Sequence, residues 1–319
     1  MSQAGIFGVD VDKARLVVAR YGAEGTESID NRAAAIRAWL TRVPAGSRIG
    51  AESTSRYHET LVRLAQAANH TVFVLNPRDV RHYAKGIGRR GKTDRVDAAV
   101  IARYVAKEAD QLHAHVPRTD AQQVAHVLQQ QRAALQRAFS QLRQALTAHG
   151  PTEAFRPLMD AARQALRQVD KRIQAQMLAS KQAALFKRLM SVPGIGPVVA
   201  ACLVHHLHRW PLAHVDAWVA CTGLDPRPND SGRRVGVRVL SKRGDATLRQ
   251  MLYLAAMTFA RHRLGKPLAE RYRQRRLSTT ATYNILARLL ARIVWSLSKT
   301  TQSFDAQRFA NDHRIDIAA

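Results

Sequence analysis

The chain has 319 residues, a formal net charge of +26 and a pI of about 11.3. So large a positive excess favours a polyanionic partner, and nucleic acid is the first candidate. We find no long apolar segment, lipidation motif or apolar leader, which argues against a membrane protein and against secretion. Cys202 and Cys221 lack the spacing of a metal site, so we expect free thiols in a reduced cytoplasmic compartment.

The first part of the chain alternates strand and helix patterns. Strands are predicted at residues 6–11, 16–20, 49–52 and 71–75. Helices are predicted at residues 32–42, 56–68 and 94–107, with Asn31 and Thr93 as candidate caps and a loop rich in Gly and Arg at residues 85–92. A hairpin followed by strand–helix units is typical of the α/β sheet of RNase H-like proteins, which we assign to residues 1–112.

Four carboxylates are distributed over these elements. Asp10 lies within the first apolar strand, and Glu52 ends the third. Asp94 and Asp97 are three residues apart at the start of a helix and therefore share one face. A buried carboxylate on a central strand is costly unless it is paired or bound to a metal. We therefore predict that the four bind a hard divalent cation, Mg²⁺ or Mn²⁺, with Asp12 as a rival ligand.

Residues 113–186 differ in composition and are expected to be helical. Gln, Ala, Arg and Leu dominate, and Leu128, Leu135 and Leu142 recur every seven residues. With a turn at Gly150-Pro151, this pattern predicts a hairpin of the coiled-coil type. Two helices that pack on their own domain and a contact between two subunits would explain the heptads equally well.

Residues 187–319 form a third block, which we expect to be mostly helical, with helices at 198–207, 245–262 and 282–299. Residues 192–196 resemble the turn of a helix–hairpin–helix, whose glycines let the backbone approach a phosphate. A plain Gly-rich turn is the alternative. His205, His206 and His208 lack the spacing of metal ligands, and we interpret them as surface or groove-facing residues.

A stretch rich in Gly, Pro and Arg contains a candidate nucleophile, Ser231. It precedes a glycine, and two arginines follow that could hold a phosphate. Such a serine could attack phosphorus and form a covalent ester, although a Ser-Gly pair is more often a turn. Ser241 has similar surroundings and is a rival. The residues that we expect to contact nucleic acid are Gly194, Gly196, Arg233, Arg234, Lys242 and Arg243.

These motifs together resemble the IS110 family of insertion-sequence transposases, with its IS1111 branch, which carry a DEDD tetrad of acidic residues. In the first half the resemblance rests on residues 8–13, 52–54 and 92–98. In the second half it rests on residues 192–197, 223–226, 230–232 and 241–245. The motifs follow one another in the family's order and cover nearly the whole chain.

The resemblance implies a RuvC-like domain, a coiled-coil segment and a C-terminal transposase domain. It implies a tetrad that binds Mg²⁺, formed by Asp10, Glu52, Asp94 and Asp97. It also implies that Ser231 attacks DNA to form a phosphoserine link. The implied partners are donor and target DNA, further copies of the chain in a dimer or tetramer, and a noncoding bridge RNA. Asp12 and Asp230 depart from the family's pattern, which often has serine at both positions.

Our hypothesis is therefore an RNA-guided recombinase that combines a serine nucleophile with a metal-bound acidic tetrad. A structure-specific nuclease, similar to a junction resolvase, would need the tetrad but not Ser231. A catalytically inactive nucleic-acid-binding protein, for example a relative of a pilus-gene invertase, would need only the basic surface.

Overall fold

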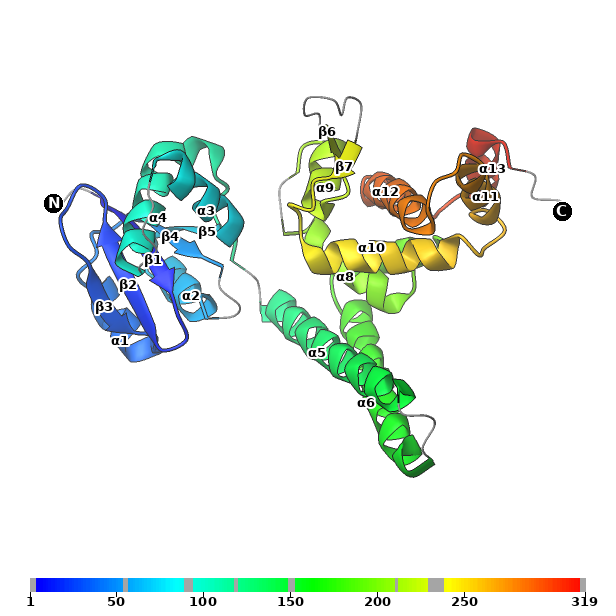
Figure 1. Cartoon of the computed structure of the whole chain (residues 1–319), viewed down its shortest axis with the longest axis horizontal. Coiled ribbons are helices and arrows are strands. Elements are labelled where there is room, and N and C mark those ends of the chain that lie inside the picture. The colour runs from blue at the N-terminus through cyan, green and yellow to red at the C-terminus, as the bar shows by residue number, and fades with distance from the viewer. Residues whose placement is uncertain are drawn as a thin grey trace. The chain divides into compact units, whose positions relative to one another are not determined.

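The computed structural model describes residues 4–53, 57–88, 94–117, 120–148, 153–209, 212–228 and 238–315. The chain divides into two compact units, Met1–Pro117 and Arg118–Ala319 (Figure 1), and each is described by itself. In the described part of the chain, no helix combines the length and the apolar character that a membrane span requires.

The first unit is built on a mixed five-stranded sheet with the order β3-β2-β1-β4-β5. The antiparallel strands are β1 (Ile6–Val11), β2 (Arg15–Arg20) and β3 (Glu27–Asp30). On the other side of β1, the parallel strands are β4 (Arg48–Glu52) and β5 (Thr71–Leu75). The first strand is therefore central and the predicted α/β class is confirmed, but the short polar strand β3 is not among the predicted strands.

Helices cover both faces of this sheet. On one face, α1 (Ala33–Leu40) and α2 (Glu59–Ala67) bury apolar side chains against alternate residues of β1, β2 and β4. On the other face lies α4 (Asp94–Glu108), which contacts β1, β2 and β4 and also packs against α3 (Pro77–Gly86). A 3₁₀ turn at Ala109–Gln111 ends this layer.

Two glycines let α4 approach the sheet closely. A Cβ atom at Gly8 would lie 2.2 Å from the carbonyl oxygen of Ala98 and 2.2 Å from the amide nitrogen of Ala102. A Cβ atom at Gly50, the register partner of Gly8, would lie 2.5 Å from a methyl group of Val105. Backbone thus packs on backbone at Gly8, and this contact fixes where α4 crosses β1.

Asn31 has a different role from the predicted helix cap. The residue before α1 is Arg32, and its side chain makes no capping hydrogen bond. Instead, the amide group of Asn31 donates to the carbonyl oxygens of Asp12, at 2.8 Å, and Tyr57, at 3.1 Å. These two hydrogen bonds tie the turn after β1 to the segment before α2.

Helix α3 is not among the predicted helices, since Asn followed by Pro can also end a strand in a turn. The side-chain oxygen of Asn76 accepts a hydrogen bond of 2.9 Å from the amide of Arg78, and Pro77 occupies the first helical turn. Asn followed by Pro is a signature of a helix start as well as of a turn. Thr93, the predicted cap of α4, lies outside the described residues.

The substitution Asn76→Ala is expected to destabilise the first unit by about 1 kcal/mol, because it removes this capping hydrogen bond. Urea denaturation monitored by circular dichroism would measure the change, and Asn76→Asp, which keeps a capping oxygen, should leave the midpoint nearly unchanged. Equal losses in both variants would show that the capping hydrogen bond contributes nothing to the free energy of unfolding.

The second unit begins with a helical pair, as the heptad pattern predicts. Helices α5 (Asp120–Ala148) and α6 (Arg156–Leu178) pack side by side (Figure 1). A 3₁₀ turn at Glu153–Phe155 precedes α6. An ion pair of 2.6 Å joins Arg132 to Asp170 across the pair. The two helices therefore pack on each other within one chain, and the predicted turn at residues 150–151 lies outside the described residues.

The rest of this unit is mostly helical, as predicted, around one large apolar core. Its helices are α7 (Ala183–Met190), α8 (Pro197–Leu207), α9 (Val215–Thr222), α10 (Ala246–Phe259), α11 (Lys266–Gln274), α12 (Thr279–Ser298) and α13 (Ala306–His313). Between α9 and α10, the short strands β6 (Pro226–Pro228) and β7 (Arg238–Leu240) form an antiparallel hairpin. The buried Trp218 joins α9 to α12 through a hydrogen bond of 2.9 Å from its indole nitrogen to the carbonyl of Ala291.

Candidate active site

Asp10 and Glu52 occupy neighbouring positions at the carboxyl ends of β1 and β4. The parallel register pairs Gly8 with Gly50 and Val9 with Ala51, so the next positions along the two strands are those of the carboxylates. Side chains alternate between the faces of a sheet, and both carboxylates therefore share the face of the two glycines, which α4 covers. Both side chains are half-buried, and each takes part in an interaction within the chain.

The first turn of α4 lies at this same edge of the sheet. After α4 the chain returns to the start of β5, where the amide of His115 donates to the carbonyl of Val72 at 2.7 Å. The helix therefore runs against the direction of β1, and its beginning lies toward the carboxyl ends of the strands. Asp97 is half-buried and directly precedes Ala98, which contacts Gly8.

The structure brings the elements of the predicted tetrad to one edge, but it does not show an assembled metal site. The side chain of Asp94 lies outside the described residues. Among the side chains that are described, no three His, Cys, Asp or Glu residues form a group that could hold a metal ion. The assignment of Asp10, Glu52 and Asp97 as metal ligands therefore stays a prediction.

Asp12, the rival ligand, has a local structural role. It is exposed in the turn between β1 and β2, and its carboxylate accepts a hydrogen bond of 3.3 Å from the amide of Ala14. Hydrogen bonds from the backbone amides of Lys13 and Ala14 hold the pKa of Asp12 below its ordinary value. This turn accounts for the carboxylate without a metal.

In the second unit, the predicted nucleophile lies between β6 and β7 in sequence. Residues 229–237, which include Ser231, Arg233 and Arg234, lie outside the described residues. The described structure defines the two ends of this loop, because Pro228 pairs with Arg238 and Pro226 with Leu240.

Asp225 holds the base of this hairpin together. Its carboxylate accepts hydrogen bonds from the hydroxyl group of Ser241 and, at 2.7 Å, from the guanidinium of Arg227. The amide of Ser241 also donates to the carbonyl of Asp225 at 3.0 Å. These contacts fasten both the hydroxyl group and the backbone of Ser241 to Asp225, which favours a structural role for Ser241, the rival nucleophile.

Residues 241–245, which we call the strap, connect the hairpin to α10. The amide of Lys242 donates to the carbonyl of Gly223 at 3.2 Å, and the amide of Asp245 donates to the carbonyl of Cys221 at 2.9 Å. A Cβ atom at Gly244 would lie 2.1 Å from the same carbonyl oxygen of Cys221. The strap is thus fastened to the end of α9, while the side chains of Lys242 and Arg243 are exposed, as contacts to a phosphate backbone require.

The two glycines of the predicted helix–hairpin–helix turn, between α7 and α8, have different surroundings. Gly194 has a φ of +90°, and a Cβ atom there would lie 2.6 Å from the carbonyl oxygen of Ala255 in α10. Gly196 is exposed, precedes α8 and has open space around it. Close packing on α10 therefore explains why a glycine stands at position 194, without contact to a phosphate. Gly196 has the space to approach a ligand.

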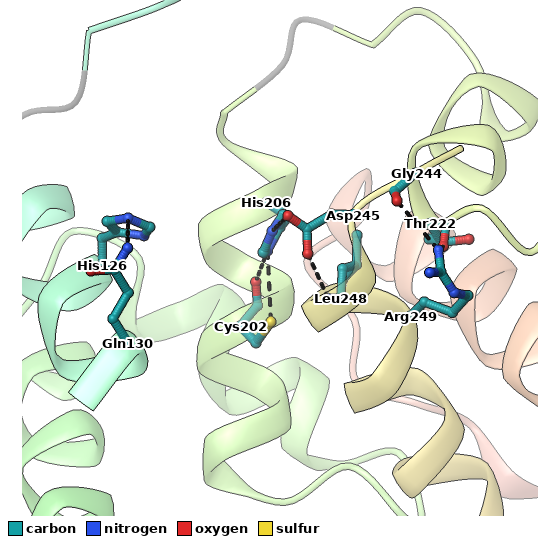
Figure 2. Close-up of polar contacts among 9 residues, drawn as sticks. All are labelled: His126, Gln130, Cys202, His206, Thr222, Gly244, Asp245, Leu248 and Arg249. Atoms are coloured by element: carbon teal, nitrogen blue, oxygen red, sulfur yellow. Dashed lines mark hydrogen bonds and ion pairs between the residues drawn. The ribbon is translucent and has the colours of Figure 1, made fainter. Parts of the chain in front are cut away.

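The interpretation of His205 and His206 as surface or groove-facing residues is wrong, since their exposed fractions are 8% and 5%. Figure 2 shows that His206 points at Asp245, at the start of α10. Its Nε2 lies 3.6 Å from Oδ2 of Asp245, and its Nδ1 lies 2.8 Å from the carbonyl oxygen of Cys202. Sequence reasoning missed the partner because the two residues lie far apart along the chain.

The two charges of this pair stabilise each other. Burial lowers the pKa of His206, but the hydrogen bonds with Asp245 and Cys202 and the charge of Asp245 outweigh it and raise the pKa well above its ordinary value. Burial likewise raises the pKa of Asp245, but His206 and the backbone amides of α10 outweigh it and lower the pKa. By contrast, burial alone raises the pKa of Cys221 to about 11, so this free thiol is a poor nucleophile.

Comparisons with known proteins agree with this arrangement. Residues 7–151 match the model of the DEDD transposases of the IS110 type, and residues 186–273 match the model described as transposase IS116/IS110/IS902 family. The chain is 26% identical to the pilin gene-inverting protein of Moraxella bovis over 267 residues, which are 80% of each chain. It is 46% identical to the protein of the same name from Moraxella lacunata over 57 residues, which are 18% of each chain.

A third relative is the transposase for insertion sequence element IS1328 of Yersinia enterocolitica. It is 26% identical over 294 residues, which cover 80% of this chain and 84% of the relative. The two family models match different halves of the chain, in the order in which the DEDD and serine motifs occur in the sequence. The chain belongs to the IS110 family of DEDD transposases and is a DNA-processing enzyme.

Proposed function

We propose that this transposase cuts and rejoins DNA through a covalent bond between Ser231 and DNA, assisted by a divalent cation. One observation carries the acidic half of the proposal. Asp10 and Glu52 follow a register-paired glycine on neighbouring strands, and the helix that begins with Asp94 and Asp97 packs directly on that glycine pair. In sequence order the four residues are Asp, Glu, Asp and Asp, as in the name of the DEDD model that residues 7–151 match, which supports the assignment.

The residues at this edge suit Mg²⁺ or Mn²⁺. Carboxylate oxygens are hard ligands, which both cations prefer. Two of the carboxylates come from rigid strands and two from the first turn of a helix, so folding would hold them near one another before any ion binds. A bound cation would neutralise the negative charge that develops around the phosphate during the reaction.

The serine would act as the nucleophile. Its hydroxyl oxygen would form a bond to phosphorus while the bond from phosphorus to a ribose oxygen breaks, and the proton of the serine hydroxyl is released as the ribose oxygen gains one. The ribose hydroxyl of another strand could then attack the phosphoserine and restore both a phosphodiester and the free serine. The number of phosphate ester bonds is unchanged, so no ATP is needed. Arg233 and Arg234, next to Ser231 in sequence, would hold the phosphate.

The name of the Moraxella bovis relative favours a recombinase over a nuclease that stops after cutting. Inversion of a gene requires that the cut strands be rejoined, and that relative is a pilin gene-inverting protein. A structure-specific nuclease that uses only the acidic residues is the second candidate. An inactive nucleic-acid-binding protein is the third.

The proposed partners are DNA, a bridge RNA and further copies of the chain. The charge of +26 supports extensive contacts to phosphate backbones, whereas the sequence has no base-reading motif. An RNA that pairs with donor and target DNA would supply the missing sequence choice, as base pairing does in other RNA-guided enzymes. A dimer or tetramer would supply the several active sites that the exchange of several strands needs.

A covalent-trapping experiment tests the proposed function. The protein, the RNA transcribed from the DNA that flanks its gene, and labelled junction DNA are incubated with Mg²⁺ and denatured, and any adduct is mapped by mass spectrometry. We expect an adduct on Ser231 that disappears with a chelator. Cut DNA without an adduct would instead identify a nuclease, and tight binding without either product would identify an inactive binder.

A further inference from the structure

We propose that His206 and Asp245 form a charged pair that positions the serine loop, so that both are positioning residues of the joining reaction. This inference rests on the proposed role of Ser231. Both residues lie within the described part of the chain. The pair joins the end of α8, which carries His206, to the end of the strap, which carries Asp245.

The first step is the geometry of the imidazole ring. His206 uses both ring nitrogens, one toward the carbonyl oxygen of Cys202 at 2.8 Å and the other toward Asp245 at 3.6 Å (Figure 2). The contact of 3.6 Å has the length of an ion pair rather than of a hydrogen bond. A ring with an N–H group on each nitrogen suits both oxygens, and only the protonated ring has both. The orientation of the ring therefore favours the cation.

The second step is that the two carboxylate oxygens of Asp245 have different partners. Its Oδ1 accepts a hydrogen bond of 2.8 Å from the amide of Leu248 and caps α10, whereas its Oδ2 faces His206 (Figure 2). An asparagine could provide the same cap through its side-chain oxygen, but it would place a neutral group beside the ring. The helix cap therefore needs only one oxygen of Asp245. The negative charge of the carboxylate is needed for the ion pair with His206.

The third step is the path from the pair to the serine loop. The amide of Asp245 is bonded to the carbonyl of Cys221, and the strap that Asp245 ends carries Ser241, which is fastened to Asp225. Arg249 adds two hydrogen bonds of 3.3 Å from one of its nitrogens, to the carbonyl oxygens of Thr222 and Gly244 (Figure 2). A shift of Asp245 would therefore displace the Leu240 end of β7, and with it the short strand whose first residue, Arg238, follows the loop of Ser231 in sequence.

The surroundings of the pair make its charge dependent on Asp245. The ring of His205 meets that of His206 edge-on, with centroids 5.2 Å apart, and His126 of α5 stacks on His205 at 5.6 Å. The thiol of Cys202 lies 3.6 Å from Nδ1. Of the titratable groups that these contacts bring next to His206, the carboxylate of Asp245 is the one that carries a negative charge at neutral pH.

The experiment compares Asp245→Asn and His206→Gln with a matched control, Asp216→Asn, in the full-length protein. Asp216 forms an exposed ion pair of 2.6 Å with Arg292, so the control also removes one carboxylate charge from the same unit. The protonation of His206 is measured by NMR of histidine-labelled protein, and the rate of adduct formation on Ser231 is measured beside the Kd for DNA.

We expect the His206 ring of the wild type to stay protonated up to at least about pH 8, well above the ordinary pKa of about 6.5. In Asp245→Asn, burial without a counter-charge should leave the ring neutral at about pH 7. The rate of adduct formation should fall at least about tenfold in both variants, with the Kd for DNA changed less than about twofold. The control should match the wild type in every respect.

Two results would overturn the inference: a ring that stays charged in Asp245→Asn, or a wild-type rate of adduct formation in both variants. Equal losses in adduct rate, DNA binding and thermal stability would also overturn it, because they would indicate a general structural role. If the wild type itself forms no adduct on Ser231, the proposed function fails first, and the NMR titration still reports whether the charged pair exists.

Discussion

Asp10→Asn is expected to abolish the metal-dependent cutting of DNA while the protein stays folded and continues to bind DNA. The substitution keeps the size of the side chain but removes one charged oxygen ligand from the edge where β1 and β4 end. Loss of several kcal/mol of charge stabilisation corresponds to a decrease in rate of about 10³-fold or more. Single-turnover cleavage of labelled DNA would measure it.

A second readout for this variant does not depend on activity. Mg²⁺ at ten times its Kd should raise the free energy of unfolding of the wild type by about 1.4 kcal/mol, which thermal melting would detect. Asp10→Asn should lose this increase. Asp110→Asn, which removes an exposed carboxylate beyond the far end of α4, should keep both the increase and the cleavage rate. Full cleavage by Asp10→Asn would contradict the metal assignment.

The parts of the fold that the sequence predicts well are those with a strong period. The apolar runs of β1, β4 and β5 indicate buried strands, and the heptads indicate α5 and α6. Strand β3 gives no such signal, because Glu27–Asp30 is short and polar, with every second residue exposed. Helix α3 gives an ambiguous one, because Asn76-Pro77 can start a helix or a turn. Burial of Val80 in the core beside α4 decides for the helix, and this contact is visible only in three dimensions.

The candidate site shows the same division between local pattern and tertiary contact. Asp10 and Glu52 could be recognised because each is an acidic residue within or at the end of an apolar run that predicts a strand. The strand register then confirms that they are neighbours in the sheet. The pair of His206 and Asp245 has no local signature. A histidine on an apolar helix and an aspartate before a helix each have an ordinary explanation, and only packing of α8 on the start of α10 brings them together.

Gly8→Ala is the second prediction with a large effect, because it acts on the fold that positions the acidic residues. The added Cβ would lie 2.2 Å from two backbone atoms of α4, and neither atom can rotate away as the end of a side chain could. Either α4 must move off the sheet or β1 must bend. We expect the first unit to lose at least about 3 kcal/mol of stability. Amide hydrogen exchange, analysed separately for β1 and α4, would measure the loss.

The matched control is Gly86→Ala, since Gly86 ends α3, has no left-handed φ and has no atom within 4 Å of an added Cβ. That variant should be neutral or slightly more stable, because alanine is the better helix former. Gly8→Ala should also lose the Mg²⁺-dependent increase in stability, although all four carboxylates remain, since Asp94 and Asp97 reach the edge of the sheet only while α4 packs on Gly8. If this variant kept wild-type exchange rates and the full response to Mg²⁺, close packing at Gly8 would not be what brings the helix to the carboxylates of β1 and β4.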